Sequence, residues 1–184
     1  MSTGGGEIQD VLTFWFVENG REQWFQKDDA FDSEMRRRFA DLQVRAAAGG
    51  CVDWEATEDG RMALILVLDQ FSRNLYRDDP RAFAQDARAR AIARTAIALG
   101  DHVTAAPDRK LFLYLPFEHS EALADQDWCM TLFTALGDPE LLAYAERHRV
   151  IVERFGRFPH RNAVLGRDTT PDELEFLQQP GSSF

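Results

Sequence analysis

The chain has 184 residues, of which 45% are hydrophobic and 28% are charged, and these values are typical of one folded globular domain. Its 31 acidic residues outnumber the 21 lysines and arginines, so the formal net charge is −10, which repels nucleic acid and anionic membrane surfaces. We therefore expect a single domain over residues 1–184, with flexible ends at 1–6 and 180–184, that binds neither nucleic acid nor membranes.

The cysteines and the apolar runs indicate a compartment. Cys51 and Cys129 are the two cysteines and lie far apart in sequence, so neither a paired-cysteine metal motif nor a disulfide framework is present. The start of the chain lacks the basic and apolar regions of a secretory signal, and the longest apolar run, from Met62 to Leu68, is too short to span a bilayer. These features predict a cytoplasmic protein with reduced thiols.

Apolar residues spaced three and four apart predict helices along the whole chain. Most of these segments end at glycine, at Asn-Gly or before proline, where helices commonly stop. Short strands are too few and too isolated to build a sheet, so the fold class is all-α. The predicted helices, about eight in number, occupy residues 8–16, 31–46, 61–75, 82–99, 110–115, 121–136, 139–155 and 171–177.

The helix expected at 61–75 is apolar nearly all round in its first half, as in a helix enclosed by its neighbours. Asp69 directly follows this apolar run and must find a partner, because an unpaired buried carboxylate is costly. Arg73, four residues later, lies on the same helix face. We predict that Asp69 is buried and accepts hydrogen bonds from an arginine or a histidine. A local ion pair between these two residues would explain both of them structurally.

A second polar motif is LYLPFEHSE, in which Pro116 is expected to interrupt a helix. Such a break leaves backbone groups near a helix start, where anions are accommodated. Ser120 or Glu121 can satisfy part of these groups as caps. His119 lies beside Glu118, and a carboxylate partner can orient a histidine as a general acid or base.

The third motif is a basic island around RFGRFPHRN, which covers Arg154 to Asn162. Five arginines fall within the fifteen residues from Arg147 to Arg161, opposed only by Glu153. Arginine forks recognise carboxylate and phosphate groups through paired hydrogen bonds. Arg157, His160 and Arg161 are therefore candidate ligand-binding residues. The structural alternative is that these arginines tie the C-terminal segment to Asp69, Glu118 and Glu121.

Metal, nucleotide and nucleophile motifs are absent from the sequence. It contains no HExxH and no Glu followed three residues later by His, and its four histidines show no ligand spacing. It also lacks the GxSxG, GxxxxGK and GxGxxG patterns. We expect neither a metal ion nor a cofactor.

Four stretches together resemble a known family: LDQFSRNLYRDDPRAFAQD, FLYLPFEHSE, HRVIVERFGRFPHRNAVLGR and TPDELEFL. The chain from Val11 to Leu177 resembles the uncharacterised bacterial proteins of the domain-of-unknown-function family number 924. This resemblance implies a tetratricopeptide-like fold of stacked antiparallel helices, and it implies no activity.

Three functional hypotheses remain open. The first is binding of a small anionic molecule or an acidic peptide by a cleft that contains Asp69, Arg73, Glu118, His119, Arg157, His160 and Arg161. The second is a hydrolase-type enzyme in which His119 or His160, with Glu118 nearby, serves as general acid or base while arginines stabilise negative charge. The third is a buried structural network. The lack of nucleophile, metal and cofactor motifs favours binding, and we predict that RFGRFPHRN and LPFEHSE face each other across one pocket.

Overall fold

The computed structural model describes residues 4–183, and within this part of the chain every regular element is a helix. The predicted all-α class is confirmed. The chain divides into two compact units, Met1–Arg77 with Arg81–Pro116 and Asp78–Pro80 with Phe117–Phe184, and each is described by itself. The single domain over residues 1–184 and the tetratricopeptide-like stacking remain predictions.

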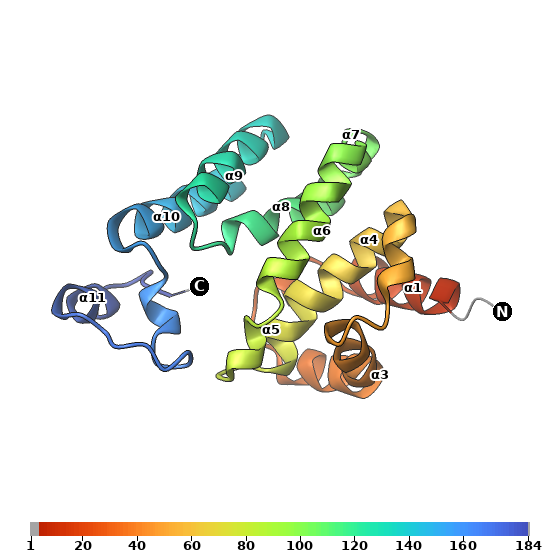
Figure 1. Ribbon diagram of the computed structural model, residues 1–184, viewed down its shortest axis with the longest axis horizontal. Helices are drawn as coiled ribbons and strands as arrows, with labels where there is room; N and C mark the ends of the chain where they lie inside the picture. Colours follow the sequence, from red (N-terminus) through yellow and green to blue (C-terminus); the bar gives the residue numbers. More distant parts are fainter. Residues whose placement is uncertain (1–3, 184) are drawn as a thin grey trace. The chain divides into compact units, whose positions relative to one another are not determined.

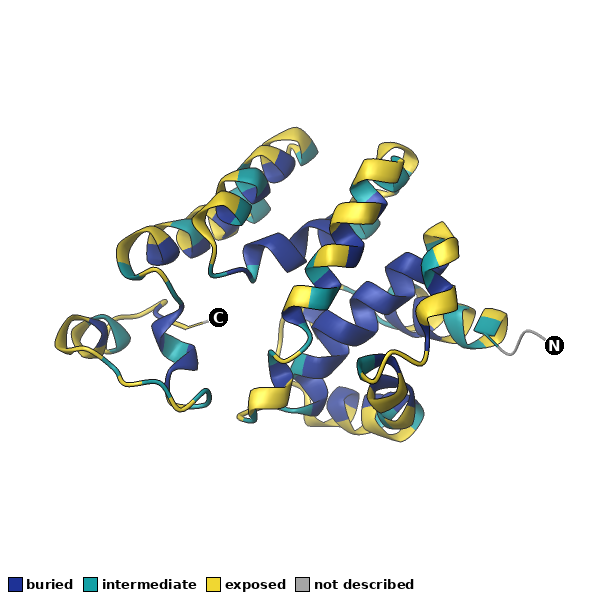
Figure 2. Ribbon diagram, viewed as in Figure 1, coloured by how far each residue is buried: buried dark blue, intermediate teal, exposed yellow. Residues whose placement is uncertain are grey.

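The first unit contains the central helix of the protein. Three segments, α4, the π-helical η3 and α5, run without interruption from Glu58 to Leu75. The elements α1, α3, α6 and η2 pack against them. Figure 2 shows most of this helix in the colour of buried residues. The elements of this unit are α1 (Gly4–Thr13), η1 (Phe14–Glu18), α2 (Arg21–Trp24), α3 (Asp29–Ala47), η2 (Val52–Ala56), α4 (Glu58–Ile65), η3 (Leu66–Phe71), α5 (Ser72–Leu75), α6 (Asp86–Leu99) and α7 (Asp101–Thr104).

The first half of the central helix is as enclosed as its composition predicts. Every residue from Met62 to Leu68 is at most 3% exposed. Thr57 caps its start, since the Thr57 Oγ1 accepts a hydrogen bond from the Gly60 backbone N–H at 3.1 Å. Burial of these apolar side chains supplies the main driving force for folding of this unit.

The second unit is built on a helical hairpin. Its elements are α9 (Leu123–Leu136), α10 (Pro139–Phe155), η5 (Pro159–Arg161) and α11 (Pro171–Leu177), while α8 (Pro107–Glu118) runs into it from the first unit and η4 (Pro80–Ala82) spans the boundary. The helices α9 and α10 pack side by side in opposite directions (Figure 1). Gly137 makes the turn possible because it adopts a left-handed conformation with φ of 79°.

The helix starts predicted from local sequence signals are confirmed in this unit. The Asp138 Oδ1 accepts hydrogen bonds from the Glu140 and Leu141 backbone N–H groups at 3.0 and 3.2 Å. Thr170 and Glu173 form the expected reciprocal capping box at the start of α11. Both signals act within one turn of chain, so the sequence alone is enough to predict them.

Pro116 does not interrupt its helix, and the prediction of a break there is wrong. α8 continues through Pro116 to Glu118. Proline removes one backbone donor, yet the helix runs two residues beyond it, and the Gln126 Nε2 donates to the Glu118 and Ser120 carbonyls, each at 2.7 Å, where the chain leaves α8. Other helix starts differ from the prediction as well, since α6 begins at Asp86 and α9 at Leu123, later than predicted, while α1, α4 and α8 begin earlier, at Gly4, Glu58 and Pro107.

The ends of the chain fall partly outside the described residues, which exclude 1–3 and 184. Within them, Gly4 begins α1, and the Ser182 Oγ donates to the Leu177 carbonyl at 3.2 Å. Among residues 4–183, no helix is both long enough and apolar enough to cross a bilayer.

Candidate functional site

Asp69 lies in the first unit and is paired as predicted. Its side chain is 1% exposed, and its Oδ1 accepts a hydrogen bond from the Arg73 Nη1 at 2.8 Å. The Gln70 Nε2 donates to the other carboxylate oxygen at 2.6 Å. Arg73 also donates to both carboxylate oxygens of Asp86, each at 3.0 Å. Asp86 was not among the predicted partners, because only the packing of α6 brings it to Arg73.

The other five predicted site residues, Glu118, His119, Arg157, His160 and Arg161, belong to the second unit. Two of them, His160 and Arg161, lie against Phe158, a fully buried ring. The Arg161 guanidinium carbon lies 4.5 Å from the centroid of this ring, and the rings of His148 and His160 each lie 5.6 Å from it. We call Phe158, His148, His160, Arg161 and His119 the Phe158 cluster.

His119 and Glu118 join this cluster through short contacts. The Arg161 Nη1 donates to the His119 carbonyl at 3.1 Å. A carboxylate oxygen of Glu118, a residue that is 4% exposed, lies 3.6 Å from the His148 Nδ1. The cluster therefore combines side chains from the end of α8, from α10 and from η5.

His148 is the member of the cluster that the predicted site residues did not include. Burial lowers its pKa to about 3, and the positive charges of His119, Arg161 and His160 act in the same direction. The His148 Nδ1 donates to the Tyr144 carbonyl at 2.9 Å, so this nitrogen carries the proton of a neutral ring. In the sequence, His148 lies three residues from both Ala145 and Ile151, which are also on the buried side of α10. This spacing is the signal that predicts its burial.

Arg157 points to α11 instead. It donates to both carboxylate oxygens of Glu173, at 2.6 and 2.8 Å, and to the Asp168 carbonyl at 2.7 Å. The Asn162 Nδ2 donates to the same carboxylate at 3.3 Å. Glu173 was predicted only as a capping residue, and it serves both as the cap and as the partner of Arg157.

Glu121 and Arg167 connect the second and third motifs. The Arg167 Nη1 and Nη2 donate to the two Glu121 carboxylate oxygens at 2.7 and 3.0 Å. The Phe158 backbone N–H donates to the Glu121 Oε1 at 2.8 Å, and the Arg167 Nη2 donates to the Phe158 carbonyl at 2.9 Å. These contacts hold the two motifs side by side within the second unit. An open pocket between them remains a prediction.

The pair of Arg157 and Glu173 predicts a specific acid sensitivity. The hydrogen bonds from Arg157 are the main cause that lowers the pKa of Glu173 from 4.5 to about 2. Because the folded pKa is the lower one, the pair stabilises the fold above about pH 4.5, and this contribution is lost as the pH falls through about 2. We expect the melting temperature of Arg157→Ala to fall less than that of the wild type between these two pH values. Parallel curves from scanning calorimetry would contradict this expectation.

Comparisons with known proteins give the family. A family model described as "Bacterial protein of unknown function (DUF924)" matches residues 11–181. The chain belongs to this family. It is also similar to a solved structure of a protein of unknown function from Agrobacterium tumefaciens, with 41% sequence identity and a TM-score of 0.90 over 95% of this chain and 98% of that chain. A comparison with curated proteins gave no match.

In this DUF924 chain, Cys129 and Ser120 are two further side chains of the second unit whose surroundings are structural. Burial raises the pKa of the Cys129 thiol, so this thiol stays protonated at neutral pH. The Ser120 Oγ donates to the Asp125 Oδ2 at 2.7 Å and accepts from the Ala122 backbone N–H at 3.2 Å, two residues before the N-cap position of α9, which Ala122 itself occupies. Residues 4–183 contain no group of three or more side chains suited to hold a metal ion. The catalytic roles of His119, Glu118 and His160 remain predictions.

Proposed function

We propose that the protein binds a small anionic ligand, through a phosphate or carboxylate group, at the Phe158 cluster. The observation that supports this proposal is the convergence of Arg161, His160 and His148 on the buried ring of Phe158, with the His119 carbonyl bound to Arg161. In a chain with a net charge of −10, an arginine surrounded by histidines is a local exception. The guanidinium of Arg161 is the group expected to attract an anion there.

Arg161 is the residue expected to contact the anion. Its guanidinium plane is held by the Phe158 ring on one side and by its hydrogen bond to the His119 carbonyl. A guanidinium whose orientation is already fixed loses little entropy when it binds a phosphate or a carboxylate group. The fixed geometry therefore favours a ligand with two oxygen atoms that accept paired hydrogen bonds from the planar guanidinium.

The surroundings of Arg161 favour a small ligand. Arg161 itself is 6% exposed, whereas His119 and His160 are partly exposed and provide the approach from solvent. Glu118 places a carboxylate beside His148, so an anion is expected on the His160 side of the cluster. The negative charge of the whole protein would repel a polyanion, whereas a single phosphate or carboxylate group interacts only with this local region.

Thermal unfolding with inorganic phosphate and with citrate tests the proposal. A ligand that binds the folded state raises the melting temperature by mass action, by roughly 2–4 °C for each kcal/mol of binding in a protein of this size. We expect His160→Ala and Arg161→Lys to reduce or abolish this rise. Arg149→Ala is the matched control, since Arg149 belongs to the same basic island but already donates to Asp127 and Glu153, and it should keep the rise.

Two outcomes would favour a purely structural cluster. One is an unchanged melting temperature across both anions. The other is a rise of equal size in the wild type, in His160→Ala and in Arg161→Lys, which would place the anion elsewhere. The melting temperatures of the wild type and the variants without ligand separate loss of binding from loss of stability. Arg161→Lys suits this comparison because it keeps the charge and most of the side-chain volume.

A further inference from the structure

The outward side of α10 carries a stripe of exposed arginine and apolar side chains. Tyr144, Arg147, Val150 and Arg154 follow one another at intervals of three and four residues, so they share one side of the helix. Tyr144 and Val150 are each 50% exposed, and Arg147 and Arg154 are exposed as well. We call these four residues the α10 stripe.

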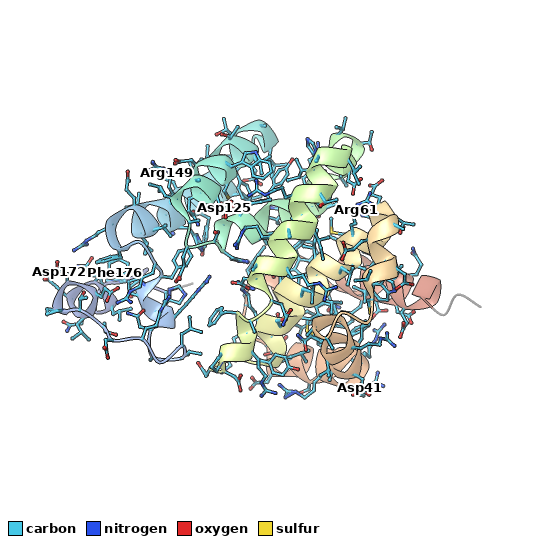
Figure 3. All side chains as sticks on the ribbon, viewed as in Figure 1. Asp41, Arg61, Asp125, Arg149, Asp172 and Phe176 are labelled. Carbon is cyan, nitrogen blue, oxygen red and sulfur yellow. The ribbon has the colours of Figure 1, made fainter. Side chains whose placement is uncertain are left out.

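Aromatic rings hold both arginines of the stripe in place. The Arg147 guanidinium carbon lies 5.3 Å from the Tyr144 ring centroid. That of Arg154 lies 4.6 Å from the Phe155 ring and 6.0 Å from the ring of Phe176 on α11, which is labelled in Figure 3. Stacking on rings limits the motion of a guanidinium while leaving its donors available at the edge.

Neither arginine of the stripe forms an ion pair with a carboxylate of residues 4–183. Arg149 on the same helix, also labelled in Figure 3, provides the contrast, since it donates to Asp127 at 2.7 Å and to Glu153 at 3.1 Å. Carboxylates are abundant in this acidic chain. The stripe nevertheless keeps two ordered cations that no internal carboxylate neutralises.

We propose that the α10 stripe docks an acidic amphipathic helix of a partner protein. Arg147 and Arg154 are seven residues apart, which is about 10 Å along a helix. Two carboxylates separated by two turns of the partner helix match this spacing, and an apolar side chain between them contacts Val150. Ordered arginines and aromatic side chains around an apolar centre are typical of the residues that contribute most to protein interfaces.

The charge of the molecule distinguishes this partner from nucleic acid. A net charge of −10 repels a polyanion over its whole length, whereas a short helix with two carboxylates interacts only with the stripe. Glu146 is exposed at the edge of the stripe and repels the same carboxylates. Glu146→Gln is therefore expected to strengthen docking.

Fluorescence anisotropy with a labelled helical peptide tests the proposal. The peptide carries two glutamates separated by two turns with leucine between them, and its control carries glutamine in place of both glutamates. We expect the wild-type protein to bind the acidic peptide at least about tenfold more tightly than the control, and the double variant Arg147→Glu/Arg154→Glu to lose this difference. The charge-matched variant Arg37→Glu/Arg94→Glu alters exposed arginines on α3 and α6 and should bind as the wild type does.

Other outcomes would overturn the proposal. Equal affinity for the acidic and the glutamine peptides would show that the stripe does not recognise carboxylates, and so would equal binding by the two double variants. If the wild type self-associates in sedimentation while Arg147→Glu/Arg154→Glu stays monomeric and neither binds the peptide, the occupant is a second copy of this chain. His160→Ala should bind the peptide normally, so that failure of the anion site and failure of the stripe can be distinguished.

Discussion

Replacing Asp69 by alanine is expected to lower the free energy of unfolding by about 3 kcal/mol, the lower end of the range for breaking a buried ion pair. The reason is that Arg73 and Gln70 both lose a hydrogen-bond acceptor, and that the carboxylate they share is 1% exposed. The lower end applies because Arg73 keeps its two hydrogen bonds to Asp86. Urea denaturation followed by circular dichroism measures the change.

A surface ion pair provides the control for this prediction. Glu34 and Arg37 form an exposed pair at 2.6 Å within α3, and exposed pairs contribute little to stability. Glu34→Ala should leave the denaturation midpoint unchanged within error. A loss below about 1 kcal/mol for Asp69→Ala would be the size expected of an exposed pair and would contradict the buried one.

Replacing Gly60 by alanine is expected to have a similarly large effect for a steric reason. A Cβ atom at this position would lie 2.0 Å from the Trp54 carbonyl oxygen and 2.8 Å from the Thr57 Oγ1. The first of these atoms belongs to the backbone of η2, so the clash is removed only if α4 or η2 shifts. We expect a loss of about 3 kcal/mol, the upper end of the usual cost of overpacking.

Gly6→Ala is the matched control, because Gly6 is exposed within α1 and a Cβ atom there would meet nothing within 4 Å. Alanine costs less entropy than glycine in a helix, so this variant should gain about 0.5–1 kcal/mol. Equal stability of Gly60→Ala and the wild type in urea denaturation would show that η2 is not packed against α4 as described.

Local sequence patterns predicted much of the fold correctly. The apolar run from Met62 to Leu68 predicted the enclosed central helix, and Asp138 and Thr170 predicted the starts of α10 and α11. Each of these features depends on side chains and backbone groups within one or two turns of each other. Asp69 belongs with them, because its partner Arg73 lies one turn away on the same helix.

Pro116 shows where a local rule fails. Proline usually ends a helix because it removes a donor and crowds the preceding turn. In this chain α8 nevertheless continues to Glu118, and Gln126 of the following helix donates to the Glu118 and Ser120 carbonyls where the chain leaves α8. The sequence places Gln126 ten residues away and gives no sign of that contact.

The partners of the arginines in the third motif were decided by tertiary structure alone. The sequence by itself determined the all-α class, the helix caps, the family and the basic island of Arg147 to Arg161. It did not determine that Arg157 pairs with Glu173, or that Arg167 rather than an arginine of the island pairs with Glu121. A long, flexible side chain pairs with whichever carboxylate the packed helices bring within reach, and in an acidic chain that choice depends on distances in space that sequence spacing does not record.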